Sequence, residues 1–137
     1  MNILDSSTFK RVMHFKFFMV IGVWGLVPLL IPKSLIPYLG LNLTDTQIIF
    51  VRIWGVIVLL DFFVYWYIYK NPHSKWTKYL LLFGVADNGG LGLVLLALTP
   101  LMSLPWGIWI HIPFQLFFGY WFWRFYTEGF KASRDNT

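Results

Sequence analysis

Cysteine is absent from this 137-residue chain, and charged residues are scarce. A chain without thiols has no disulfide framework, no thiolate zinc or iron–sulfur site and no cysteine nucleophile. Asp, Glu, Lys and Arg make up 12% of the residues, whereas a soluble domain carries about 25%. Because a chain this short exposes a large share of its surface, these few charges cannot cover it in water.

Apolar residues, by contrast, are abundant. They make up 58% of the chain and aromatic residues 21%, with a mean hydropathy of +0.63. This composition predicts an integral membrane protein, an all-α chain whose residues 1–137 form one domain. The 11 Lys and Arg residues form no continuous basic patch, so the expected partner is the lipid bilayer and not nucleic acid.

Successive apolar runs predict an antiparallel four-helix transmembrane bundle. The expected spans are about 15–31, 48–69, 79–98 and 106–126, because a run of roughly 17 to 25 residues crosses the hydrocarbon core. Thr44 and Gln47 form a capping-box pattern that predicts the start of the second span. Pro72 predicts its end, and Ser74 can cap the third span.

Lys and Arg residues gather at one end of these spans. The N-terminal flank, the second loop and the C-terminal flank hold Lys10, Arg11, Lys16, Lys70, Lys75, Lys78, Arg124, Lys131 and Arg134. The opposite side has only Lys33 and Arg52. By the positive-inside rule, both termini face the cytoplasm, which predicts a multi-pass protein of the cell (inner) membrane.

Polar side chains near the outer ends of the spans predict a pocket. Arg52 and His111 lie at similar depth in the second and fourth spans, and Gln115 follows His111 by one helical turn. Pro113 cannot donate to the carbonyl of Trp109, which predicts a kink beside His111. These features predict a polar pocket of Arg52, His111 and Gln115 that opens outward. The alternatives are that Arg52 snorkels to the headgroups and that His111 is a satisfied core residue.

A second polar layer lies deeper. Asp61 and Asp87 lie at matched depth in the second and third spans, with Asn88 beside them. An ionisable group at the bilayer centre costs about 2.5 to 3.5 kcal/mol, so it faces protein or water. These residues are therefore candidate proton or cation groups, because two close carboxylates can share a proton. Whether they meet depends on helix rotation, and the alternative is that both acids are neutral hydrogen-bonding groups.

Small residues recur at four-residue spacing on two spans. Gly84, Asn88 and Gly92 form one stripe, and Gly119 continues the spacing of His111 and Gln115. Such stripes predict close helix packing, with Gly84, Gly92 and Gly119 at the contacts. The histidines lie at opposite ends of the spans, which excludes a haem held by two of them. The sequence therefore predicts no metal and no cofactor.

Two stretches carry a family resemblance. Val51-Arg52-Ile53-Trp54-Gly55 opens the second span, and Lys70-Asn71-Pro72 ends it. This pairing resembles small four-helix bacterial membrane proteins, the DoxX-like proteins and their uncharacterised relatives. The resemblance implies a four-helix bundle. It also implies an acidic residue in the fourth helix, where this chain has His111-Ile112-Pro113-Phe114-Gln115.

Two classes of function fit these features. The first is a non-enzymatic binding or accessory subunit that packs on another membrane protein or on its own copies, because the extramembrane parts are too short for a catalytic domain. The second is a small carrier or intramembrane enzyme for a lipophilic or quinone-like substrate, or for a proton or cation. It would use Asp61, Asp87, Arg52 and His111, with a lipid or quinone-like molecule as the expected ligand.

Overall fold

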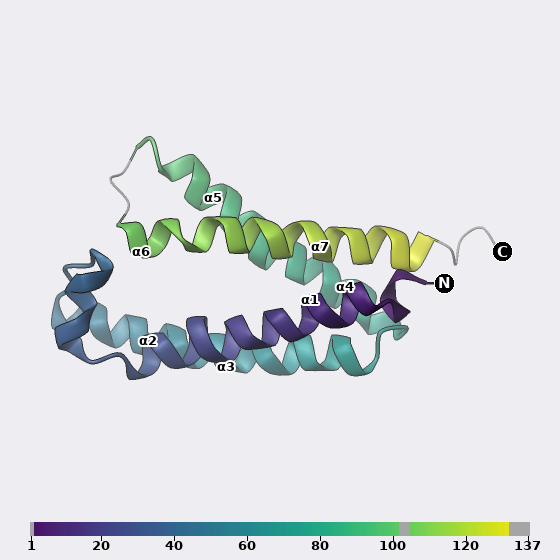
Figure 1. Ribbon diagram of the computed structural model, residues 1–137, viewed down its shortest axis with the longest axis horizontal. Helices are drawn as coiled ribbons and strands as arrows, with labels where there is room; N and C mark the ends of the chain where they lie inside the picture. The colour runs from purple at the N-terminus through teal and green to yellow at the C-terminus, as the bar shows by residue number, and fades with distance from the viewer. Residues whose placement is uncertain (1, 102–104, 132–137) are drawn as a thin grey trace.

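The computed structural model describes residues 2–101 and 105–131, and in these ranges it contains helices and loops but no strand (Figure 1). The all-α prediction is therefore confirmed. The elements are η1 (Ile3–Asp5), α1 (Ser7–Phe18), η2 (Met19–Leu26), α2 (Val27–Leu30), η3 (Lys33–Leu39), α3 (Asp45–Lys70), α4 (Lys75–Gly84), η4 (Val85–Gly90), α5 (Leu91–Leu98), α6 (Trp106–Trp109) and α7 (His111–Lys131).

Three continuous helical runs are long and apolar enough to cross a membrane: Ser7–Leu30, Asp45–Lys70 and Lys75–Leu98. They contain most of the first three expected spans. The first run begins earlier than expected, because the Ser6 side chain accepts a hydrogen bond from the Phe9 backbone N–H at 3.1 Å and caps α1. The capping box of Thr44 and Gln47 at α3 is confirmed, as is the Ser74 cap of α4.

Two of these runs contain π-helical turns. The segment η2 interrupts the first run and η4 the third. A π turn places more residues in each turn than an α-helix does, so it changes the direction of the side chains that follow it. The segment 106–131 has a different irregularity: its helix is interrupted at Ile110, between α6 and α7. This interruption lies where Pro113 predicts a kink, since Pro113 has no N–H to donate to Trp109.

The helices are arranged as two groups. The helix α3 packs mainly on η2 and α2, whereas α7 packs on α4, η4 and α5. The first helix joins the groups, since α1 contacts both α3 and α7. At one end of the molecule η1 lies against the last turns of α7 (Figure 1), where the Asn2 side chain donates to the Gly129 carbonyl at 3.0 Å.

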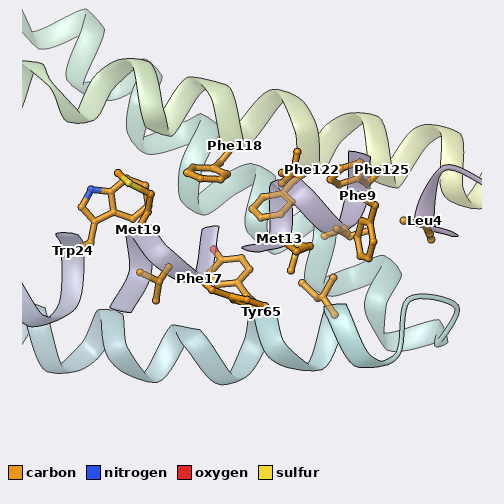
Figure 2. Packing of buried hydrophobic residues seen from close by; sticks show 14 of the residues in the cluster. Leu4, Phe9, Met13, Phe17, Met19, Trp24, Tyr65, Phe118, Phe122 and Phe125 are labelled. Carbon is orange, nitrogen blue, oxygen red and sulfur yellow. The ribbon is translucent and has the colours of Figure 1, made fainter. Parts of the chain in front are cut away.

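An aromatic core fills the space between the groups near this end (Figure 2). The rings of Phe9 and Phe125 meet edge to face at 5.0 Å, and those of Tyr65 and Phe122 stack at 5.4 Å. All four side chains are buried. Aromatic pairs of this kind contribute about 0.5 to 1.5 kcal/mol beyond the burial of their area, so this end of the molecule is closed and well packed.

At the other end, η3 lies against α6. The Trp106 indole donates to the Tyr38 carbonyl at 3.2 Å. A Cβ atom added at Gly107 would lie 2.9 Å from the Leu39 carbonyl oxygen, so the two backbones are in close contact. The chain then leaves η3 through Gly40, whose positive φ of 73° favours glycine. The connection η3 therefore ties the two helix groups together at this end.

Candidate functional site

A cavity of about 240 Å³ lies between the two helix groups. Its polar lining comes from α1, α3, η4 and α7: Lys16, Asp61, Tyr65, Asp87, His111 and Gln115. Its apolar lining comes from η2, α3 and α5: Val20, Trp24, Trp54, Val58, Leu91 and Leu95. Charged and amide groups in an otherwise apolar hollow are typical of a small-molecule site.

Lys16 is the most unexpected member of this site. Its side chain is 2% exposed, and its ammonium donates a hydrogen bond to Oδ1 of Asn88. The rings of Tyr65, Trp24 and Phe118 lie 4.5, 4.6 and 4.9 Å from Nζ. These cation–π contacts and the hydrogen bond replace the water that an ammonium normally binds. The expected place of Lys16 among the end charges is therefore wrong.

Asn88 connects Lys16 to the acidic part of the site. Its side-chain amide donates to the Gly84 carbonyl at 2.8 Å and to Oη of Tyr65 at 3.1 Å. Tyr65 in turn donates to Oδ2 of Asp87 at 2.9 Å. Asn88 is fully buried, and both its oxygen and its nitrogen are bound to protein groups. It acts as a structural link between Lys16 and Asp87, and its amide has little capacity left for a ligand.

The two aspartates line the same cavity. Asp61 comes from α3 and Asp87 from η4, so the helix rotation that the sequence left open brings both carboxyl groups to one hollow. Asp87 accepts the Tyr65 hydrogen bond, whereas none of the described residues donates a hydrogen bond to the Asp61 carboxylate. One buried ammonium thus shares the cavity with two carboxylates, which is an arrangement that can bind and release a proton.

His111 and Gln115 form the α7 wall of the cavity. The Trp24 indole donates to Nδ1 of His111 at 2.6 Å, so in the neutral ring the proton is on Nε2. Gln115 is 9% exposed, and its Oε1 has no hydrogen-bond partner among the described residues. A buried acceptor without a donor is a group that a bound molecule can satisfy.

Arg52 is separated from these two residues. Its guanidinium donates to the carbonyl oxygen of Pro28 at 2.9 Å and to that of Ile31. These carbonyls belong to the C-terminal end of the first helical run, where they lack intrahelical partners. The structure thus places His111 and Gln115 in the cavity and Arg52 at a helix end, outside the cavity lining. Its guanidinium therefore does not reach the expected pocket of His111 and Gln115.

The glycines of the two stripes lie where α7 meets the third run. A Cβ atom added at Gly84 would lie 2.7 Å from the Phe122 ring, and one at Gly92 would lie 3.0 Å from Leu116. At Gly119 it would lie 2.5 Å from the Cα atom of Gly89. This close approach holds η4, with Asp87 and Asn88, against the helix that carries Gln115.

Two polar residues of the site were missed at the level of sequence, Lys16 and Tyr65. The spacing of Phe9, Met13, Lys16 and Val20 holds the signal for Lys16, since these residues lie on one face of a helix. Comparison of the chain with models of protein families, with curated proteins and with solved structures found no match. The resemblance to DoxX-like proteins therefore stays a prediction.

Proposed function

We propose that this chain is a multi-pass membrane protein that acts as a small carrier for a proton or cation. In this proposal three spans are the apolar runs Ser7–Leu30, Asp45–Lys70 and Lys75–Leu98, and α7 is the fourth helix of an antiparallel bundle. Both termini face the cytoplasm. The contact between η1 and the last turns of α7 supports this topology, because an even number of spans returns the chain to its starting side.

One observation carries the proposal: Asp61 and Asp87 share a cavity with the buried Lys16. If all three groups are ionised, the cavity has one positive and two negative charges, so one carboxylate lacks an internal counter-charge. At intramembrane depth such a carboxylate is costly unless it binds a proton or another cation. Binding and release of that proton or cation is the elementary step of a carrier.

The cavity also supports a carrier more than an accessory subunit. A subunit that only packs against a partner gains nothing from an ammonium, two carboxylates and an unpaired amide oxygen around a hollow. Each of these groups is expensive to bury. The closed aromatic core at one end adds a second argument, because a carrier must be sealed on one side of its site while the site is accessible from elsewhere.

Proton binding at this site can be measured as charge movement. Proteoliposomes with the protein are adsorbed on a solid-supported membrane and exposed to a jump in pH. We expect a transient charge displacement that the double variant Asp61→Asn/Asp87→Asn abolishes. Asp45→Asn is the matched control, because Asp45 is an exposed carboxylate paired with Lys33. A wild-type signal equal to that of the double variant would contradict the proposal.

The topology has its own test, which uses the absence of cysteine. Single-cysteine variants at Ser34 and Lys75, both exposed residues, are treated with an impermeant thiol reagent on intact cells. We expect labelling at position 34 and protection at position 75. The reverse pattern would invert the proposed orientation.

A further inference from the structure

A side chain in the wall of the cavity has a buried acceptor that none of the described residues uses. Gln115 is 9% exposed, it lines the cavity, and its Oε1 has no donor among the described residues. The neighbouring residues of α7 do not supply one, since Pro113 has no N–H and His111 donates no hydrogen bond to this oxygen. A ligand with an N–H or O–H group would satisfy this oxygen.

The charges around the cavity select the sign of such a ligand. Lys16 supplies one positive charge, and Asp61 and Asp87 supply two negative charges when ionised. Lys16 is already bound to Asn88 and enclosed by aromatic rings. The unmatched charge is therefore a carboxylate, and the cavity favours a positively charged group over a neutral or negative one.

The apolar side of the cavity indicates the chemistry of the uncharged part of the ligand. Trp54 and Val58 of α3 and Leu91 and Leu95 of α5 make one side of the cavity apolar. The α5 helix diverges from α3 with distance from the turn that joins α3 to α4 (Figure 1). This side of the cavity thus suits the apolar part of a ligand.

We propose that the cavity binds a primary ammonium ion with a small apolar body, of the arylalkylamine class. The ammonium lies among Asp61, Asp87 and Gln115, since three acceptors match its three N–H donors. The ring occupies the side lined by Trp54 and Leu95. A volume of about 240 Å³ limits the body to the size of a single ring. This inference rests on the proposed carrier function and names its cargo.

The ammonium ion replaces a proton in the site. The titratable groups that face the site are Lys16 of α1, Asp61 and Tyr65 of α3, Asp87 of η4 and His111 of α7. When the ammonium ion enters, its positive charge compensates the carboxylate that the proton had neutralised. That proton is then released to solvent. The charge of the site is unchanged, and acidification competes with the amine.

The test uses the full chain in lipid nanodiscs and four probes that share one ring. Isothermal titration calorimetry compares 2-phenylethylammonium with trimethyl(2-phenylethyl)ammonium, 2-phenylethanol and phenylacetate. We expect the primary ammonium to bind most tightly, the trimethyl ion about tenfold more weakly for lack of an N–H group, and the alcohol and the anion more weakly still. Titrations in two buffers of different ionisation enthalpy are expected to show proton release.

Substitutions test which side chains accept hydrogen bonds from the ammonium ion. Gln115→Leu is expected to weaken the primary ammonium by about tenfold and to leave the trimethyl ion unchanged, whereas Asp61→Asn and Asp87→Asn weaken both cations. Asp45→Asn is the control and leaves all four affinities unchanged. Equal affinities of 2-phenylethanol and 2-phenylethylammonium for the wild-type protein would overturn the proposal without any variant, as would equal loss of both cations in Gln115→Leu.

The outcome is separable from that of the carrier proposal. A pH jump that moves charge through Asp61 and Asp87, combined with no binding of the primary ammonium, overturns the amine as cargo and leaves the proton function in place. Binding of the amine with no charge movement after a pH jump overturns proton exchange and leaves the site.

Discussion

Trp24 and His111 are joined by a hydrogen bond from the indole Nε1 to the imidazole Nδ1, at 2.6 Å. The bond links η2 to the start of α7 and therefore bridges the two helix groups beside the cavity. Because indole nitrogen is only a donor, Nδ1 of His111 must be unprotonated. The bond thus orients the ring and fixes its tautomer.

Replacement of Trp24 by Phe removes that donor and keeps an aromatic ring. We expect His111 to change from one neutral tautomer to a mixture, because nothing then favours an unprotonated Nδ1. Nitrogen-15 NMR of histidine-labelled protein resolves the two tautomers. His14 and His73, both exposed, serve as internal controls, and an unchanged His111 spectrum would contradict the assignment.

Replacement of Asn88 by Leu leaves the Lys16 ammonium buried without its acceptor. We expect the free energy of unfolding to fall by about 1.5 to 3 kcal/mol, the range for a lost hydrogen bond to a charged group. The second variant Lys16→Met/Asn88→Leu removes the charge as well and should recover most of the loss. Steric-trap or denaturant unfolding measures both, and an equal effect of Asn88→Leu with and without Lys16 would show that the two residues are uncoupled.

Gly119→Ala tests the contact between α7 and η4. The new methyl group would lie 2.5 Å from the Gly89 Cα atom, so the backbones must separate. We expect a loss of about 1 to 3 kcal/mol in the free energy of unfolding. Gly90→Ala is the matched control on the same element, η4, since a Cβ atom there meets nothing within 4 Å, and it should be neutral or stabilise the helix by up to about 1 kcal/mol.

Arg52→Lys tests the helix-end role of Arg52. The guanidinium reaches two carbonyl oxygens at once, those of Pro28 and Ile31, and a single ammonium lacks that fork. We expect a loss of about 1 kcal/mol in the free energy of unfolding, for one hydrogen bond. Lys33→Ala, which removes an exposed ion pair with Asp45, should change stability by less. Unchanged stability in Arg52→Lys would mean that one carbonyl contact suffices.

Helix ends were predictable because they depend on neighbours in the sequence. Thr44 and Gln47 cap α3, and Ser74 caps α4, through bonds that span a few residues. That Asp61 and Asp87 lie at the same level along their helices was predictable too, since helical rise is nearly constant. Their shared cavity was not, because it depends on how α3 and η4 rotate against each other and on the π turns of η4.

Lys16 and Arg52 were misplaced for one common reason: their partners are distant in the sequence. Lys16 lies close to a basic flank, so its position along the chain suggests an exposed end charge. Its binding site exists only once Asn88, Tyr65 and Trp24 are brought around it. Arg52 likewise finds its acceptors only because the first helical run ends beside α3 at Ile31.

The hydrogen bond between Lys16 and Asn88 joins residues 72 positions apart, and this separation has a consequence for biogenesis. At about 5 to 20 residues per second, a ribosome needs roughly 4 to 14 s to synthesise the intervening chain. In a chain that inserts as proposed, the first helix thus enters the bilayer before the partner of its ammonium has been made. During that interval Lys16 can reach the nearby headgroups with its long side chain. Its withdrawal into the aromatic enclosure must follow the arrival of η4, so insertion of the first helix and completion of its packing are separate events in time.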